Sequence, residues 1–296
     1  MTRLEPGDPR YPALLAAVPA APALDVRGTL AVEDALAVAV VGARRATPYG
    51  VEVAEGLAAD LAARGVTIVS GLARGIDTAA HRGALAAGGR TLAVLGSGID
   101  VVYPGENRPL ADAIARQGAL LSQFPAGAQA LPGHFPARNR TIAGLALGVV
   151  VVEAAERSGA LITAGFAADL GREVFAVPGR ISSAASAGAH RLLQDGAKLV
   201  TCWQDVVQEL PEQWRRALRA ATTTDGPARP GPGSDEGRML DALTPDETQH
   251  IERLIVRGGL DAGRAAAALL ALELGGLARQ LAGQRWVRTA PRAGRG

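Results

Sequence analysis

The chain has 296 residues, 48% hydrophobic and 20% charged, and carries a formal net charge of +2 at pH 7. This composition is typical of a globular protein, and so small a net charge does not by itself indicate a polyanionic partner. One cysteine, Cys202, excludes a disulfide within the chain and favours a reducing compartment, and four scattered histidines without a second ligand at metal spacing predict no metal site.

The N-terminal segment, residues 1–34, is rich in proline and alanine and shows little periodicity, so we expect an extension packed on the main domain. Acidic residues and prolines interrupt its first 12 positions before an apolar run develops, which argues against a signal peptide. The most apolar stretch, 142–152, is about half of the ~20 residues that a membrane span needs. We therefore expect a cytoplasmic protein with no membrane partner.

Residues 35–211 alternate between strand-like and helix-like segments. Apolar runs that do not alternate with polar residues predict strands buried on both faces, and helical stretches of about ten to fifteen residues separate them. This order predicts an α/β fold with a doubly wound, mostly parallel, Rossmann-like sheet. The expected strands are 37–41, 66–70, 91–95, 119–122, 149–153, 173–177 and 198–201, and the expected helices are 51–64, 78–87, 107–117, 139–147, 159–170 and 187–195.

The C-terminal third predicts a second, smaller domain. Residues 212–237 are interpreted as a helix end and a flexible linker, because 222–237 is rich in Thr, Pro and Gly. Residues 238–290 predict a winged helix, with helices at 245–257, 261–268 and 269–274 and two short strands around Gly283. Residues 291–296 form a basic tail. Arginines near the C-terminus suit duplex DNA, whereas acidic residues in the first expected helix suit a protein partner, and both roles stay open.

Ligands of an open parallel sheet bind beyond the carboxyl ends of its strands. Every segment that follows one of the first six strands contains glycine, and five of the six contain arginine. Glycine permits close approach of the backbone, and the helix N-termini that follow offer free N–H groups and partial positive charge. Together these segments predict a long phosphate-binding surface rather than a single pocket.

The first of these segments, GARRATPYG, carries adjacent arginines where a dinucleotide-binding turn carries further glycines. Thr47 is interpreted as an N-cap and Pro48 as the first helical residue. Arg44 and Arg45 are either phosphate ligands or solvated loop residues. In the second segment, Asp77 is interpreted as an N-cap and His81 as its partner one helical turn later.

The stretch GHFPARNRTIAGL, 133–145, places an aromatic ring and two guanidiniums at the start of a helix. Phe135, Arg138 and Arg140 combine a stacking face for a base with charges for phosphate, a pairing used on single-stranded nucleic acid. The same residues are also compatible with a plain helix start that carries an apolar staple.

Sequence features of an enzyme are sparse. No G-x-x-x-x-G-K-[ST] motif occurs, and Glu153, at a strand end, has no histidine, nucleophile or metal ligand nearby in the sequence. An alternative is a nucleotide enzyme related to the lysine-decarboxylase-like phosphoribohydrolases. These carry a P-G-G-x-G-T-x-x-E loop, and the chain has ERSGALITA at that place. We therefore expect no enzyme activity, with a pure adaptor as a further alternative.

Six motifs, in order, resemble the DNA-processing protein A family (DprA, also called Smf). They are VVGARRATPYG, SGLARGIDTAAHRGAL, LAVLGSGIDVVYPGENRPL, FPARNRTIAGL, VVEAAERSGALITAGFAADLGREVFAVPG and SAGAHRLLQDGA. The resemblance implies an extended Rossmann domain with a winged helix, binding to single-stranded DNA, dimerisation, and loading of the RecA recombinase in natural transformation. It implies no cofactor. The chain departs from the family pattern at Gln123, where an acid is common, and in its reduced N-terminal region.

The resemblance also implies a set of DNA-binding residues. They are Gly42, Arg44, Arg45 and Thr47 in the first segment, Gly71, Arg74 and Gly75 in the second, Phe135, Arg138, Asn139 and Arg140 in the fourth, and Ser158, Gly159 and Thr163 in the fifth. For the dimer we predict a surface within 189–199 that includes an exposed pair, Leu192 and Leu193.

Overall fold

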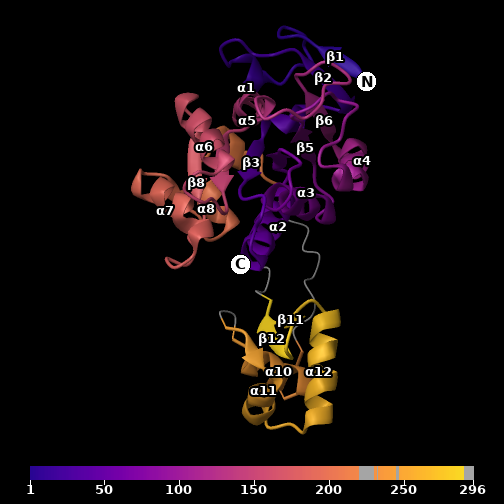
Figure 1. Ribbon diagram of the computed structural model, residues 1–296, viewed down its shortest axis with the longest axis vertical. Coiled ribbons are helices and arrows are strands. Elements are labelled where there is room, and N and C mark those ends of the chain that lie inside the picture. The colour runs from indigo at the N-terminus through magenta and orange to yellow at the C-terminus, as the bar shows by residue number, and fades with distance from the viewer. Residues whose placement is uncertain (220–229, 232, 245–246, 290–296) are drawn as a thin grey trace. The chain divides into compact units, whose positions relative to one another are not determined.

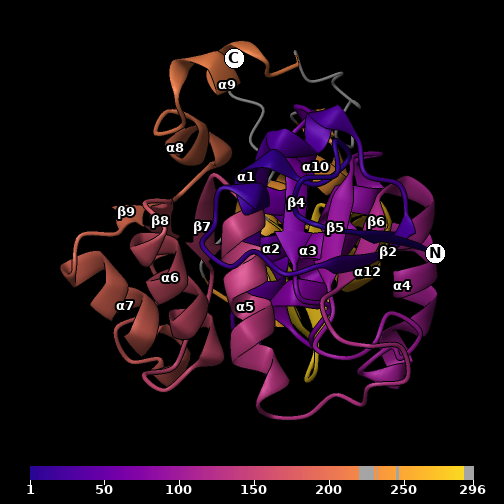
Figure 2. The same cartoon turned by 90° about the horizontal axis from the view of Figure 1, so that it is seen from above.

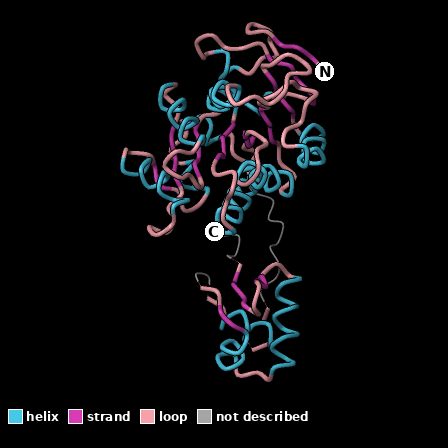
Figure 3. Tube along the Cα trace, viewed as in Figure 1, coloured by secondary structure: helices cyan, strands magenta, loops and turns pink. Residues whose placement is uncertain are grey.

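The structure is a computed structural model that describes residues 1–219, 230–231, 233–244 and 247–289. It divides into two compact units, Met1–Ala221 and Thr222–Gly296. In the first unit, helices flank a central sheet (Figures 1 and 3). No helix within the described part of the chain is long and apolar enough to cross a membrane.

The sheet of the first unit has the strand order β1-β2-β6-β5-β4-β3-β7-β8-β9. Strands β3 to β9 run parallel to one another. In β3 to β7, short apolar runs are buried at every position, as strands covered on both faces require. This arrangement confirms the doubly wound, mostly parallel sheet. The strands are β1 (Thr2–Leu4), β2 (Leu24–Gly28), β3 (Ala37–Val41), β4 (Thr67–Ser70), β5 (Thr91–Val94), β6 (Ala119–Ser122), β7 (Gly148–Val151), β8 (Glu173–Ala176) and β9 (Lys198–Leu199).

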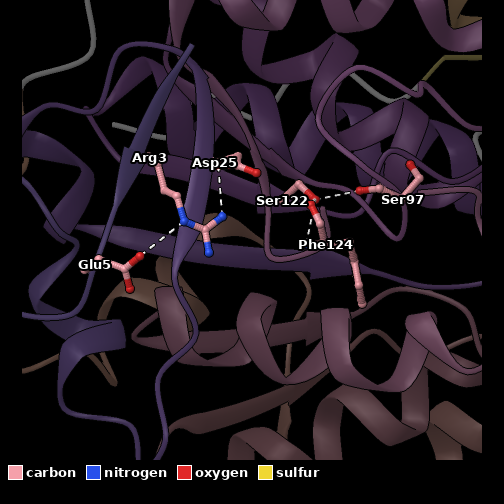
Figure 4. Close-up of polar contacts among 6 residues, drawn as sticks. All are labelled: Arg3, Glu5, Asp25, Ser97, Ser122 and Phe124. Carbon is pink, nitrogen blue, oxygen red and sulfur yellow. Dashed lines mark hydrogen bonds and ion pairs between the residues drawn. The ribbon is translucent and has the colours of Figure 1, made fainter. Parts of the chain in front are cut away.

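The N-terminal segment contributes two strands where only a packed extension was expected. β2 pairs antiparallel with β6 and β1 pairs antiparallel with β2. Arg3 on β1 forms ion pairs with Glu5 and with Asp25 of β2, both at 3.2 Å (Figure 4). In the same view, the Ser122 hydroxyl at the end of β6 donates to the Ser97 carbonyl at 2.6 Å. The segment is therefore part of the sheet.

Helices cover both faces of the sheet, since alternate residues of each strand enter different apolar clusters. Helices α1 (Ala13–Ala16), α5 (His134–Leu145) and α6 (Gly159–Asp169) pack on one face with Val41 and Val149. Helices α2 (Pro48–Ala63), α3 (Ile76–Ala86), α4 (Arg108–Gln117) and α8 (Trp203–Val207) pack on the other. Figure 2 shows α5 and α6 side by side. Helix α7 (Ala187–Gln194) contacts β8, and α9 (Glu212–Arg216) follows α8.

The sheet changes winding direction at β3. The chain runs from β3 outward through β4, β5 and β6, and then returns to place β7 on the other side of β3. In a doubly wound sheet, such a switch point leaves a crevice beyond the carboxyl ends of the two central strands. The topology therefore places a binding site beside the ends of β3 and β7.

The second unit is a winged helix, which has three helices and a three-stranded sheet within its described residues. Figure 1 shows its helices beside strands β11 and β12. Its elements are α10 (Asp235–Ala242), β10 (Gln249–His250), α11 (Ile251–Gly258), α12 (Ala262–Leu274), β11 (Ala278–Leu281) and β12 (Arg285–Arg288). The predicted helix boundaries were wrong in three ways. α10 begins within the expected linker, where Ser234 caps it. Two of its later residues, Met239 and Leu240, are buried. The helix predicted at 245–257 starts only at Ile251, because β10 pairs with β12. α12 is continuous where two helices were expected.

Candidate nucleic-acid interface

A pocket of about 420 Å³ lies at the switch point of the sheet, and we call it the switch-point pocket. The end of β3, the segment before α3, the start of α5 and the start of α6 line it. The structure thus gathers residues from four segments that are far apart in the sequence. Eight of the predicted DNA-binding residues line the pocket: Gly42, Arg44, Phe135, Arg138, Asn139, Ser158, Gly159 and Thr163.

Arg44 and Phe135 form a pair at this pocket. The guanidinium carbon of Arg44 lies 4.5 Å from the centroid of the Phe135 ring. The ring of Tyr103, a residue that is 48% exposed, has its centroid 6.3 Å from that of Phe135. Arg44 is exposed and forms no ion pair within the described residues. α5 begins at His134, five residues before the predicted start, so Phe135 belongs to its first turn. The pair offers an available cation beside an aromatic face.

Arg138 has a different environment from Arg44. Its side chain is buried and donates to the Gly71 carbonyl, to the Val94 carbonyl at 2.9 Å and to Asn139 Oδ1 at 3.0 Å. Burial lowers its pKa from 12.5 to about 10, with Asp77 opposing this shift and Arg44 adding to it. Arg138 therefore stays charged at neutral pH and ties together the carboxyl ends of β4 and β5.

Asp77 is the buried counterion of Arg138 rather than the N-cap of α3, which is Gly75. Its carboxylate accepts from the N–H groups of Gly71 at 3.2 Å and Ala73 at 3.3 Å. Burial raises the pKa of Asp77, and Arg138 opposes this rise most strongly. The expected contact with His81 is absent from the described contacts, because His81 instead bonds Thr91 at 2.7 Å.

The start of α6 forms a further part of the pocket wall. Ser158 caps the helix by accepting from the Ala160 N–H at 3.3 Å, and Gly159 carries no side chain that would cover the helix end. Asn139 Nδ2 donates to the Gly159 carbonyl at 3.1 Å and so fixes α5 against α6. Thr163 is buried and donates weakly to the same carbonyl at 3.5 Å. The helix end presents partial positive charge to the pocket.

Six predicted residues do not line the pocket, and three of them are engaged elsewhere by their side chains. Arg74 pairs with Glu106 at 2.5 and 2.7 Å, Arg140 donates to the Pro19 carbonyl at 2.9 Å, and Thr47 bonds Glu153. Thr47 is the N-cap of α2, as predicted.

The other three contribute geometry or remain in solvent. Gly71 accepts from Arg138, and Gly75 (φ +75°) approaches the first segment so closely that a Cβ would lie 2.2 Å from the Ala43 oxygen. Arg45 is exposed and forms no ion pair among the residues that the structure describes.

Sequence reasoning missed the apolar part of the pocket wall. Pro132, Pro136, Ile142 and Ile162 line it, and Ile162 is 45% exposed. Prolines at the start of a basic helix and isoleucines on α5 and α6 are common in helix packing, so nothing in the sequence alone indicated a place in this wall. Apolar and aromatic surface beside cations suits a ligand with both bases and phosphates.

The predicted dimer surface is only partly exposed. Leu192 is half-buried and packs against the apolar cluster beneath α5 and α6, so it was wrong to describe it as exposed. Leu193 is also half-buried, while Leu199 in the same range is 52% exposed.

Within the described residues, no cluster of three His, Cys, Asp or Glu side chains could hold a metal ion.

Comparison with protein families matches both units. A model described as DNA recombination-mediator protein A covers residues 2–211, and one described as the DprA winged helix domain covers residues 223–284. The chain belongs to the DNA recombination-mediator protein A family. This finding confirms the resemblance that the six motifs indicated.

Several relatives in the family are known. DNA processing protein DprA of Streptococcus pneumoniae is 52% identical over 176 residues, which are 58% of this chain and 61% of that protein. A putative DNA processing protein DprA of Mycobacterium tuberculosis is 44% identical over 255 residues, which are 84% of this chain and 64% of that protein. The chain thus spans less than two thirds of the length of these relatives.

Two solved structures share the fold. The X-ray structure of DprA from S. pneumoniae matches with a TM-score of 0.68 and 47% identity, over 71% of this chain and 74% of that one. A structure of DprA from Helicobacter pylori, which concerns the single-stranded DNA binding mode of that protein, matches with a TM-score of 0.64 and 29% identity. It covers 71% of this chain and 97% of that one.

Proposed function

We propose that this chain binds single-stranded DNA at the switch-point pocket and acts in DNA processing during transformation or recombination. The observation that carries the proposal is the Arg44–Phe135 pair, with its guanidinium 4.5 Å from the ring centroid at the mouth of a pocket that also receives a helix N-terminus. Arg44 neutralises a phosphate, and Phe135 stacks with the neighbouring base.

The proposed ligand is a single strand rather than a duplex. The pocket is a concave site lined by the end of β3, the segment before α3 and the starts of α5 and α6, and Phe135 is only half-exposed within it. A base reaches such a ring only when it is unstacked and unpaired, whereas duplex bases are occupied by their partners. The relative from H. pylori is itself described by its single-stranded DNA binding mode, which supports this choice.

Fluorescence anisotropy with a labelled oligo-dT of about 20 nucleotides tests the proposal, with unlabelled duplex as competitor and a series of salt concentrations. We expect binding that weakens as salt rises, because each neutralised phosphate releases counterions. We also expect duplex to compete poorly. Arg10→Ala is a matched control, because Arg10 is an exposed arginine paired with Asp8, outside the pocket. Absence of single-strand binding, or equal competition by duplex, would contradict the proposal.

We further propose that the protein acts without catalysing a reaction, as a homodimer that loads a RecA-type recombinase onto the bound strand. Family membership and the exposed Leu199 support these roles. Light scattering of the wild type and of Leu199→Arg tests the dimer, and a variant that stays dimeric would reject this surface. Assembly of RecA on oligo-dT, measured with and without the protein, tests the loading.

A second proposal concerns the winged helix, for which a protein partner fits better than duplex DNA. The exposed side of α12 carries alanines together with Leu270 and Leu274, which are 54% and 84% exposed. The one arginine of α12, Arg264, is bound to Asp235 at 2.6 and 2.8 Å. A helix without a free cation offers little to a phosphate backbone. Gel-shift assays with the isolated second unit test this, and salt-sensitive duplex binding that Leu274→Glu abolishes would overturn it.

A further inference from the structure

The N-terminus of α2 is the place where this fold ordinarily receives the phosphate of a nucleotide. α2 follows the central strand β3, beside the switch point of the sheet. It has 16 residues, so its first turn presents unpaired N–H groups and partial positive charge. The ligand at this helix end therefore decides whether the chain accepts a free nucleotide.

A carboxylate of the protein itself already lies there. Glu153, two residues after β7, is 2% exposed. Its Oε2 accepts from the Thr47 N–H at 2.9 Å, and its Oε1 accepts from the Thr47 hydroxyl at 2.5 Å. The Thr47 Oγ1 in turn accepts from the Gly50 N–H at 3.1 Å. The Thr47 N–H, the Thr47 hydroxyl and the Gly50 N–H at the start of α2 are thus used within the chain.

The first turn of α2 is shaped around this carboxylate. A Cβ on Gly50 would lie 2.4 Å from both Cδ and Oε2 of Glu153, closer than side-chain atoms can approach. Only glycine at position 50 leaves room for the carboxylate to lie against the helix. The missing side chain of Gly50 is an observation independent of the hydrogen bonds, and both point to a built internal anion.

We propose that Glu153 determines specificity by filling the phosphate position at α2 with an internal anion. It excludes free nucleotides and inorganic phosphate from this helix end. An external phosphate is then left to the side chain of Arg44 and to the start of α6, which line the neighbouring pocket. The proposal concerns which anions are rejected, and it stands whether or not single-stranded DNA is the ligand of the pocket.

The test uses Glu153→Ala in the full chain with inorganic phosphate as the probe. Removing the carboxylate frees the donors of Thr47, so we expect phosphate at about 50 mM to raise the Tm of this variant by about 5 °C more than that of the wild type. Glu153→Gln keeps the bulk and removes the charge, so its Tm should respond as the wild type does. A Glu153→Ala protein that folds and gains no phosphate response would overturn the proposal.

Two further measurements locate the effect. The phosphate response of Glu153→Ala should persist when Arg44→Ala is added, because it arises at α2, and its loss in the double variant would place the anion in the switch-point pocket and reject the proposal. In Arg44→Ala, which keeps Glu153 and lacks the neighbouring cation, the amide NMR signals of Thr47 and Gly50 should not shift on titration with phosphate. A saturable shift of these signals would show that the helix end is open and would overturn the proposal even if Glu153→Ala does not fold.

Discussion

Replacing Arg44 with alanine removes the cation on which the phosphate contact depends. Arg44 is exposed and has no ion pair within the described residues, so its loss leaves no buried charge without a partner. Its contact with Phe135 exists in the free protein and therefore contributes little to the change in binding. A hydrogen bond to a charged group contributes about 1.5–3 kcal/mol, and for an exposed site the lower value applies. We expect single-strand affinity to fall roughly tenfold.

The salt dependence distinguishes the loss of a phosphate contact from a loss of folded protein. Each phosphate contact on a single strand contributes about −0.7 to the slope of log K against log salt, so Arg44→Ala should make the slope shallower by about that amount. Arg44→Lys should keep the slope, because it keeps the charge, while binding more weakly because the planar fork is lost. Anisotropy with oligo-dT and with mixed sequences should show equal losses for both. An unchanged slope, or a loss confined to one sequence, would refute the phosphate contact.

Three other changes probe the surrounding structure. Phe135→Ala should weaken single-strand binding by about 1–3 kcal/mol, because a stacking contact with a base is lost. The salt slope should stay unchanged, because that contact carries no charge. Anisotropy measures both, and an altered slope would contradict the stacking role. Arg138→Met should lower the free energy of unfolding by about 3 kcal/mol in urea, since it leaves the Asp77 carboxylate buried without its counterion, and a change below about 1 kcal/mol would contradict that role. His81 is fully buried, and desolvation lowers its pKa from the ordinary 6.5 to about 3. When the pH is below 6.5, the unfolded chain therefore binds a proton at this histidine that the folded chain does not bind. Stability should therefore be retained above pH 6.5 and fall by about 1.4 kcal/mol per unit as the pH drops toward 3, and urea titrations of His81→Gln should lack this component.

The central part of the fold could be predicted because its strands have an unambiguous pattern. Runs such as Ala37–Val41 are apolar at every position, which only a strand covered on both faces requires, and the segments between them have helical length. β1 and β2 were missed because they have three and five residues in a proline-rich segment, and the pairing of β2 with β6 depends on residues about a hundred positions away. α5 was predicted to start at residue 139, whereas it starts at His134, and Pro136 lies in its first turn, where proline is tolerated.

The sequence indicated which segments line the candidate site, but not which of their side chains are exposed to a ligand. Arg44 and Arg138 both follow a buried strand and both stand beside a second polar residue, so the sequence offers no signal that separates them. The difference arises in three dimensions. Arg138 lies over the ends of two strands, where the carbonyls of Gly71 and Val94 need donors and Asp77 needs a counterion. Arg44 is exposed and forms no ion pair with any residue that the structure describes. Burial decides that one guanidinium supports the pocket and the other is available to a ligand.

The adjacent arginines after β3 acquire a physical reason from this arrangement. A dinucleotide fold binds phosphate with the backbone N–H groups of a glycine-rich turn and the helix that follows. In this chain Glu153 accepts from the Thr47 N–H and hydroxyl, and Thr47 Oγ1 accepts from the Gly50 N–H, so these donors at the helix start are not free for an external phosphate. A phosphate arriving at this edge of the sheet needs a donor that reaches beyond the filled position, and a long arginine side chain provides one. In this proposal Glu153 and Arg44 have complementary roles. Glu153 occupies the phosphate position of the nucleotide site, and Arg44 provides a cation for an external phosphate beside it.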